Sequence, residues 1–225
     1  FDIPAYTLQT NGMAVASILD FAKNYCPDAK LYQASSSEMF GNSIDNDGYQ
    51  RLSTPMNPTS PYGCAKVLAY NLVKHYRSAY GLFYCNGILF NHESPRRGTN
   101  FVTNKVIKTA VEIKLGISKK LELGNLDASR DWGHSKDYVR AMHAILQYST
   151  SKDWIIATGE SRTVRELCEI AFKSLNLNYK DFVSTNKKYL RPEELRFLKG
   201  DSEAAREKLK WKPEYAFEDI INEMI

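Results

Sequence analysis

Two short strands separated by one long helical segment constrain the fold of this chain more than any other feature. The first strand is Leu31–Ser35, the second is Phe83–Phe90, and the stretch 61–80 between them has the apolar spacing of a helix. Strands that alternate with helices in this way are typical of a parallel sheet with helices on its faces. The sequence therefore predicts an α/β fold with an open sheet.

Polar side chains follow both strands at the point where each strand ends. The first strand runs into the turn Ser35-Ser36-Ser37-Glu38, and the second runs into the polar loop 91–101. In an open α/β sheet, ligands bind at the carboxyl ends of the strands, because the loops that leave the strands form a crevice there. We therefore expect Glu38 to present a carboxylate at a ligand site.

The helical segment begins with a tyrosine and a lysine that suit acid–base chemistry. Pro61 fits the first turn of a helix, where its missing N–H costs nothing. Tyr62 and Lys66 are four residues apart, so both lie on one face of that helix. A nearby ammonium group lowers the pKa of a phenol from about 10. We therefore predict that Lys66 favours the phenolate form of Tyr62 and makes it a base.

The same Tyr-x-x-x-Lys spacing occurs twice more, at Tyr70/Lys74 and at Tyr148/Lys152. We interpret these two as ordinary pairs on helix surfaces. Tyr62 differs from them by its context, because a turn rich in hydroxyl groups and ending in a carboxylate precedes it and a proline starts its helix. Context, more than spacing, indicates a functional tyrosine.

Together these residues resemble the active-site region of the extended short-chain dehydrogenase/reductases, which modify nucleotide sugars with a hydroxyl residue and Tyr-x-x-x-Lys. Within this superfamily, the run Tyr32-Gln33-Ala34-Ser35-Ser36-Ser37-Glu38-Met39-Phe40-Gly41 is similar to the GDP-mannose 4,6-dehydratases, and the similarity extends with breaks from Phe1 to Ile225. The resemblance implies a doubly wound Rossmann-type parallel sheet with a smaller C-terminal α/β domain that binds substrate. Residues 1–95 would form the C-terminal half of an NADP-binding domain with the catalytic residues. Residues 96–225 would mainly bind the sugar nucleotide, with the chain crossing back to the sheet.

Composition excludes several other classes of protein. The 225 residues are 43% hydrophobic, which is enough for a sizeable core, and the net charge of +4 is far from that of a nucleic-acid-binding domain. Four cysteines are scattered without metal-binding or redox spacing, so we expect reduced thiols and a cytoplasmic protein. The sequence shows no apolar run of membrane-spanning length and no signal peptide at its start, and we expect no contact with membranes or nucleic acids.

A glycine-rich turn after a first strand, which carries the dinucleotide pyrophosphate in Rossmann domains, does not occur in this sequence. The start of the chain resembles the middle of the family, so we expect the sequence to be part of a longer protein. If it were complete, tight dinucleotide binding would be doubtful. The stretch 176–188 is also shorter than in relatives, which predicts missing residues near Val183-Ser184.

The resemblance also implies which residues hold the two ligands. The positions that match cofactor-binding residues of the family are Tyr6, Lys66, His92 and Arg97. The positions that match sugar-nucleotide-binding residues are Asn91, Asn100, Lys105, Arg130, Arg191 and Glu194. A planar, permanently charged guanidinium such as that of Arg130 suits a diphosphate.

Simpler interpretations exist for several of these positions. Tyr6 could pack beneath a helix, and the loop 91–101 could be an ordinary charged surface loop. Arg130 could form a local pair with Asp131, next to Trp132 as a core residue. The family has an arginine where this chain has Asn104, so one contact, within the chain or with a neighbouring subunit, could be lost.

The reaction that the resemblance implies is the conversion of GDP-mannose to GDP-4-keto-6-deoxy-mannose and water, the first step of GDP-fucose and GDP-deoxyhexose synthesis, through NADP in a homodimer or homotetramer. The catalytic residues would be Ser36, Glu38, Tyr62 and Lys66. Ser37 stands where dehydratases of other nucleotide sugars usually carry aspartate, which favours the GDP-mannose type. An epimerase or decarboxylase of the same fold and a non-catalytic sugar-nucleotide-binding fragment remain as alternatives.

Overall fold

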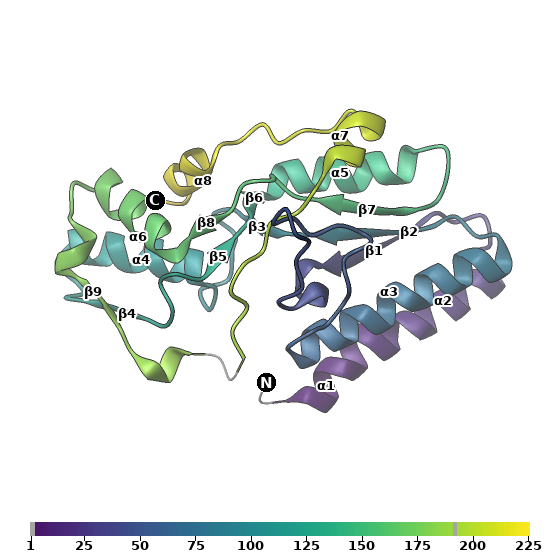
Figure 1. The fold of residues 1–225 in the computed structure, drawn as a ribbon, viewed down its shortest axis with the longest axis horizontal. Coiled ribbons are helices and arrows are strands. Elements are labelled where there is room, and N and C mark those ends of the chain that lie inside the picture. The colour runs from purple at the N-terminus through teal and green to yellow at the C-terminus, as the bar shows by residue number, and fades with distance from the viewer. Residues whose placement is uncertain (1–2, 191–192) are drawn as a thin grey trace.

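A three-stranded parallel sheet lies at the centre of the computed structural model, which describes residues 3–190 and 193–225 (Figure 1). The strands are β1 (Leu31–Ser36), β2 (Tyr84–Leu89) and β7 (Asp153–Ile156), in the order β1-β2-β7. β1 and β2 pair from Leu31↔Tyr84 to Ser36↔Leu89, so both strands end at the same edge. The predicted α/β fold with a parallel sheet is confirmed.

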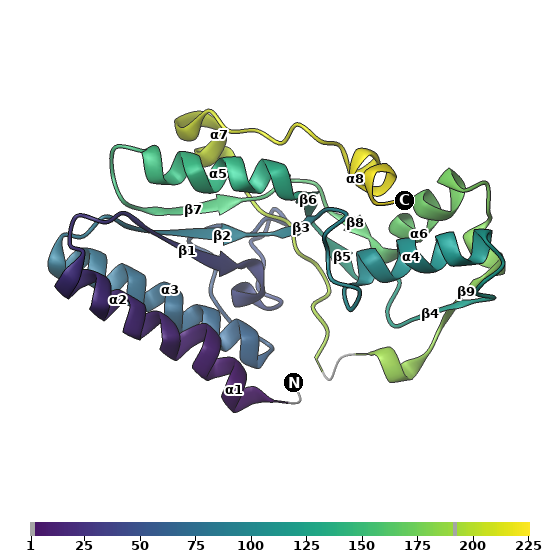
Figure 2. The same ribbon diagram turned by 180° about the vertical axis from the view of Figure 1, so that it is seen from behind.

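Helices cover both faces of this sheet (Figures 1 and 2). One face is covered by α2 (Ala14–Tyr25) and α3 (Pro61–Tyr80), and the other by α5 (Ser135–Gln147). All six residues of β2 are buried, as expected for a central strand with helices on both sides. The chain reaches α2 through α1 (Pro4–Leu8) and a π-helical turn, η1 (Gln9–Met13).

The helix predicted over residues 61–80 is present, but two large apolar side chains of the helices on this face are exposed. Ile18 of α2 is 56% exposed and Leu68 of α3 is 37% exposed. The buried face of α3 contains the small side chains Ala65 and Ala69, which let the helix lie close to the sheet. Leu68 therefore lies to one side of the contact between α3 and the sheet. The helix ends at Gly81 as predicted, in the left-handed conformation with φ +66°.

A second lobe lies beside the sheet and has its own core (Figure 1). Its helices are α4 (Val102–Lys114), α6 (Val164–Ser174) and α8 (Phe217–Met224). Its strand pairs are β3 (Asn91–Glu93) with β6 (Trp132–His134), β4 (Leu121–Leu123) with β9 (Val183–Thr185), and β5 (Ser129–Arg130) with β8 (Arg162–Thr163). Trp132 is a core residue, as predicted, and stacks on Phe217 at 5.4 Å.

Short elements complete the chain. They are the 3-10 turns η2 (Ser37–Phe40), η3 (Tyr179–Asp181) and η4 (Lys187–Tyr189), and the helix α7 (Glu203–Leu209), which packs on β7. A capping box of Thr163 and Glu166, a pattern that the sequence shows, opens α6. Val183 and Ser184, where residues were expected to be missing, lie in β9. No helix within the described residues is long and apolar enough to cross a bilayer.

One buried carboxylate ties three distant segments together. Asp131 is fully buried, and its oxygens accept hydrogen bonds from the main-chain N–H groups of Thr158 (2.8 Å), Gly159 (2.9 Å) and Gly200 (3.2 Å), and from the Thr158 hydroxyl (2.7 Å). Burial raises its pKa to about 6, against the lowering effect of these bonds. The simpler interpretation of a local pair between Arg130 and Asp131 is therefore not supported, because the Asp131 oxygens accept from main-chain N–H groups and from the Thr158 hydroxyl group.

The substitution Asp131→Asn tests this junction. It puts an NH2 group opposite buried N–H donors, and each unsatisfied buried donor costs about 1–3 kcal/mol. We expect the free energy of unfolding, measured by urea denaturation, to fall by about 2–5 kcal/mol. Asp127→Asn is the matched control, because Asp127 is exposed and only pairs with Arg165 at the surface. Equal losses in the two variants would contradict the assigned role.

Candidate active site

The turn after β1 places Glu38 at the carboxyl edge of the sheet. The Ser36 hydroxyl accepts a hydrogen bond from the Glu38 N–H at 3.2 Å and so caps η2. Met39 and Phe40 are fully buried and anchor the turn in the core. The next residue, Gly41, has φ +57°, and a Cβ there would lie 1.8 Å from the Asn57 carbonyl oxygen. Only glycine fits this position, so the course of the chain beyond the turn is fixed.

The first turn of α3 is joined to this turn by one hydroxyl group. Ser60 caps the helix by accepting from the Gly63 N–H at 3.0 Å, and it donates to the Glu38 carboxylate at 3.1 Å. A Cβ on Gly63 would lie 2.9 Å from the Glu38 carbonyl oxygen, so a glycine is needed for this close approach. The sequence analysis missed Ser60, although a serine before a helix-starting proline is a typical N-cap.

The side chains of Ser36, Glu38 and Tyr62 come together at this point. Burial and the negative charge of Glu38 raise the pKa of Tyr62, whereas a hydrogen bond with Ser36 and the positive charge of Arg97 act in the opposite direction. The phenol is 37% exposed, so it is accessible from outside the chain. The structure therefore brings together a hydroxyl group, a carboxylate and a phenol at the edge where ligands bind.

The predicted lowering of the Tyr62 pKa by Lys66 is wrong for this structure. The Lys66 ammonium lies 5.5 Å from the centre of the Tyr62 ring and donates to the Ala34 carbonyl oxygen of β1 at 2.9 Å. Burial lowers the pKa of Lys66 itself. The pKa of Tyr62 is raised overall, and the cation that acts against this rise is Arg97.

The loop after β2 continues as β3 and carries His92. The ring Nδ1–H of His92 donates to the Phe90 carbonyl at 2.9 Å, and the ring stacks on Tyr138 at 4.8 Å. Burial, together with the charge of Arg97, lowers the pKa of His92. The ring is therefore neutral and keeps Nε2 as a hydrogen-bond acceptor. Asn91 is half-buried on the same strand.

Arg97 is held in place by a buried glutamate. Its Nε lies 3.1 Å from the Glu93 carboxylate, and its guanidinium lies over the Phe101 ring at 3.5 Å. Glu93 is 2% exposed and accepts from the Thr103 hydroxyl at 2.6 Å. This part of the loop is therefore ordered by specific contacts and is not an ordinary charged surface loop.

Asn104 strengthens the same loop. Its side-chain amide donates to the Arg97 carbonyl at 2.7 Å. The position where the family has an arginine thus retains a contact within this chain, although of a different kind. Asn100 is exposed nearby, just before α4.

The predicted sugar-nucleotide residues that the structure describes lie on the second lobe and on the segment after residue 192. Lys105 donates to the Glu122 carbonyl at 2.7 Å and lies over the Tyr189 ring at 3.7 Å. Arg130, on β5, donates to the Ser129 carbonyl at 2.9 Å. Glu194 is half-buried, and Arg191 lies outside the described residues.

Tyr6 lies in α1 and is 62% exposed. The interpretation that it packs beneath a helix is therefore wrong, and its predicted contact with a cofactor stays a prediction. The sequence analysis also missed Asn42, whose side chain reaches the segment 194–196. No local pattern could have revealed it, because its partners are 152 and 154 residues away.

Comparison with known proteins identifies the family of this chain. A family model described as GDP-mannose 4,6 dehydratase matches residues 1–224. GDP-mannose 4,6 dehydratase 2 of Arabidopsis thaliana is 45% identical over an alignment that covers 100% of this chain and 61% of the relative. The human GDP-mannose 4,6 dehydratase is 44% identical, with 100% of this chain and 65% of the relative covered. The chain thus spans less than two thirds of the length of these curated relatives.

Solved structures share the fold. A dTDP-glucose 4,6-dehydratase from Bacillus anthracis, in complex with NAD, matches with a TM-score of 0.85 and 26% identity over 96% of this chain and 67% of that chain. RMD from Pseudomonas aeruginosa, complexed with NADPH, matches with a TM-score of 0.89 over 98% of this chain and 73% of that chain. Its 21% identity shows the fold alone. Because the family model spans nearly the whole sequence, this chain belongs to the GDP-mannose 4,6 dehydratase family.

Proposed function

We propose that the protein containing this chain converts GDP-mannose to GDP-4-keto-6-deoxy-mannose and water, the first step of GDP-fucose and GDP-deoxyhexose synthesis. The observation that supports this most is the grouping of Ser36, Glu38 and Tyr62 at one edge of the sheet. A phenol and a carboxylate side by side supply two separate proton-transfer groups, as an oxidation followed by an elimination requires. Glu38 is the residue that a simple oxidoreductase would not need.

Tyr62 takes the proton of the C4 hydroxyl group in the first step. Ser36, whose hydroxyl group lies close enough to the phenol to lower its pKa, orients the same oxygen. The resulting ketone acidifies the C5 proton, and Glu38 removes it. Ser36 then assists the loss of the C6 hydroxyl group, which leaves as water with the proton that Glu38 has taken from C5. Ser60, which donates to the Glu38 carboxylate at 3.1 Å, orients that carboxylate for the transfer.

NADP is the proposed cofactor, and the residues at the sheet edge fit it. The half-buried ammonium of Lys66 and the held guanidinium of Arg97 offer donors for phosphate and ribose oxygens, and Nε2 of the neutral His92 imidazole can accept from a ribose hydroxyl group. Tyr6, on α1, is the fourth proposed cofactor contact. NADP, when bound, accepts the hydride from C4 and returns it to C6, so it is not consumed.

The sugar nucleotide is proposed to bind between the two lobes. Asn91, Asn100 and Lys105 would contact it from the loop after β2 and from α4, and Arg130, Arg191 and Glu194 from the second lobe and its neighbouring segment. Residues 1–95 then form the cofactor side and 96–225 mainly the substrate side. In the structure, β7 returns from the second part of the chain to the sheet, which supports a chain that crosses back.

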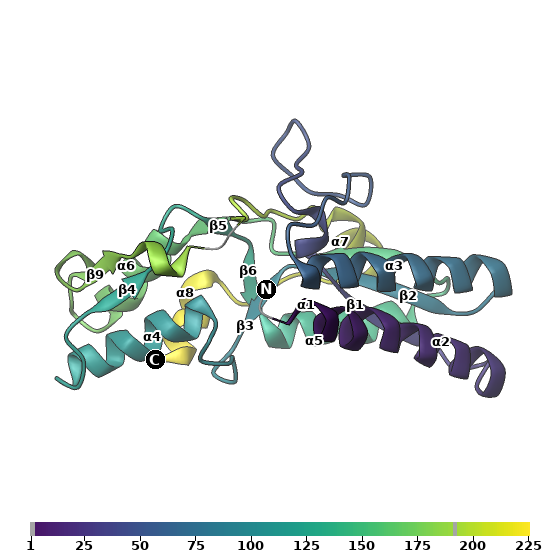
Figure 3. The ribbon, with the colours of Figure 1, turned by 90° about the horizontal axis from the view of Figure 1, so that it is seen from below.

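We also propose a homodimer or homotetramer in the cytoplasm. The apolar side chains of Ile18, Phe21 and Tyr25 on α2 are exposed, and a second copy could cover them. In Figure 3, α2 lies along the outside of α3. The four cysteines are free thiols, which suits a reducing compartment.

Product analysis tests the proposed reaction. The complete protein is incubated with GDP-mannose and NADP, and the nucleotide sugars are separated and identified by mass spectrometry and NMR. A 4-keto-6-deoxy sugar is the expected product. A C4 epimer or a decarboxylated sugar acid from other nucleotide-sugar substrates would favour the related enzymes of the same fold. Unchanged GDP-mannose would favour a non-catalytic binding protein.

Glu38→Gln separates the elimination from the oxidation. The amide cannot take the C5 proton, and general base catalysis contributes roughly 10²–10⁴-fold to rates, so kcat should fall by that factor. Ser60 can still donate to the amide oxygen, so the turn should keep its structure. NADPH should accumulate in a single turnover, measured by its absorbance, because the oxidation is spared. Normal turnover would reject the role of Glu38.

Tyr62→Phe should stop the first oxidation itself. Without the phenol oxygen, NADPH should not appear in a single turnover, and kcat should fall roughly 10²–10⁴-fold. Tyr148→Phe is the matched control, because Tyr148 has the same spacing to a lysine but lies against Trp154 at the end of α5. Loss of activity in both variants would show a general effect of losing a phenol.

Arg97→Gln should move the pH dependence of the oxidation. The charge of Arg97 lowers the pKa of Tyr62, so its removal raises that pKa and leaves less phenolate at a given pH. The rising limb of the rate of NADPH formation should therefore shift to higher pH. Arg96→Gln is the control, because Arg96 is exposed. An unchanged or acid-shifted limb in Arg97→Gln would contradict this electrostatic role.

A further inference from the structure

The loop of residues 41–59 connects the Glu38 turn to α3 and lies against a segment from the far end of the chain. It projects from the body of the molecule in Figure 3. It is attached to the segment 194–201 at two places: through Asn42 near its start and through Gln50 and Arg51 further along. The loop thus joins the proposed catalytic turn to the segment that contains Glu194.

Asn42 makes the first attachment with both ends of its carboxamide. Its Nδ2 donates to the Glu194 carbonyl at 3.0 Å, and its Oδ1 accepts from the Arg196 N–H at 2.9 Å. Because the donor and the acceptor of one side chain bind two residues of the same segment, they fix the position of that segment along the loop. A shift of the segment by one residue would break both hydrogen bonds.

The residue between these two partners is buried in the same core as the Glu38 turn. Leu195 is 2% exposed and belongs to a cluster with Met39 and Phe40, the two residues after Glu38. Leu195 therefore sets how closely the segment approaches the turn, and Asn42 sets its position along the turn. Apolar packing alone does not fix position along a chain as sharply as paired hydrogen bonds do.

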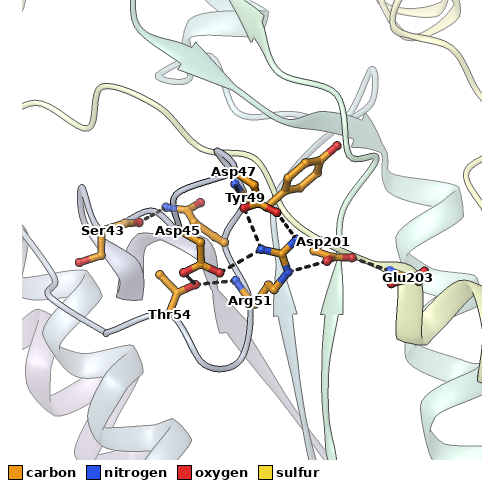
Figure 4. A network of polar contacts seen from close by, with 9 residues as sticks. Ser43, Asp45, Asp47, Tyr49, Arg51, Thr54, Asp201 and Glu203 are labelled. Carbon is orange, nitrogen blue, oxygen red and sulfur yellow. Dashed lines mark hydrogen bonds and ion pairs between the residues drawn. The ribbon is translucent and has the colours of Figure 1, made fainter.

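The second attachment holds the far part of the loop (Figure 4). The Arg51 guanidinium pairs with Asp201 at 2.7 Å, Asp47 at 2.7 Å and Asp45 at 3.1 Å. Gln50 forms a main-chain bridge with Gly200. This part of the loop is therefore anchored independently of Asn42. Removal of the Asn42 side chain should leave the loop folded and change only the placement of residues 194–196.

We propose that Asn42 is a positioning residue that fixes the segment 194–196 relative to Glu38 and so places the hexose of the bound sugar nucleotide over the carboxylate. This inference rests on the proposed function, because it takes Glu194 as part of the nucleotide site. It assigns Asn42 no contact with the reacting atoms. When Asn42 is changed, Glu194 and the bound nucleotide shift together relative to Glu38, so the contact with the nucleotide is kept whereas the hexose is misplaced over the carboxylate.

Asn42→Ala in the complete protein tests the proposal. A displacement of the order of 1 Å can cost up to about 100-fold in rate, and we expect kcat for GDP-mannose to fall about tenfold. The affinity for GDP, measured by calorimetry, should change less than about twofold. Because Asn42 is exposed, its hydrogen bonds compete with water and the melting temperature should hardly change.

Two further variants make the result specific. Asn57→Ala is the matched control, because Asn57 is also exposed and donates to the Ser43 hydroxyl within the same loop. It should keep wild-type kcat. Asn42→Asp retains the acceptor for the Arg196 N–H but loses the donor to Glu194. It should keep hydrogen-exchange protection of the Arg196 amide, which Asn42→Ala should lose, and still show reduced kcat.

The outcomes distinguish this proposal from the proposed function. Wild-type kcat in Asn42→Ala, in a protein that forms the 4-keto-6-deoxy product, overturns the positioning role alone. A tenfold loss of GDP affinity also overturns it, because Asn42 would then support binding and not placement. A wild-type protein that forms no such product overturns the proposed function, and the positioning role is lost with it.

Discussion

The close approach of the Glu38 turn to the first turn of α3 is the contact on which the site depends. It needs a glycine at position 63, because a side chain there would meet the Glu38 carbonyl oxygen and Pro58 at less than 3 Å. It also needs Ser60, whose hydroxyl group serves the helix end and the Glu38 carboxylate at the same time. Steric fit and capping thus place a carboxylate next to Tyr62, although Glu38 and Tyr62 are far apart in the sequence. The chemistry of the site follows from this packing.

Two opposite charges then set the protonation of Tyr62. Glu38 and burial favour the neutral phenol, whereas Arg97 and the Ser36 hydroxyl group favour the phenolate. In the chain by itself the first pair prevails, and the pKa of Tyr62 is raised. Arg97 can oppose the effect of Glu38 on the pKa of Tyr62, because Glu93, itself 2% exposed, holds the Arg97 guanidinium by an ion pair.

Local patterns were enough to predict the elements of the fold and the grouping of Ser36, Glu38 and Tyr62, and not enough to predict the electrostatics of this group. The strands, the helix start at Pro61, its end at Gly81 and the cap at Thr163 depend on neighbouring residues, so the sequence shows them directly. The spacing of Tyr62 and Lys66 wrongly suggested that this lysine lowers the phenol pKa. A spacing of four residues on a helix places two side chains on one face. The Lys66 ammonium group nevertheless donates to the Ala34 carbonyl oxygen of β1.

The sequence did not reveal how distant segments are joined. Polar side chains that bind main-chain groups make many of these connections. Asp131 accepts from the N–H groups of residues 158, 159 and 200, and Asp137 accepts from those of residues 214 and 215. A main-chain partner carries no residue-type signature, so no sequence pattern can identify such a bond. A carboxylate or amide that binds main chain nevertheless fixes position along the partner segment, which apolar packing does less sharply. The relative placement of the two lobes is thus determined by bonds that only the folded structure displays.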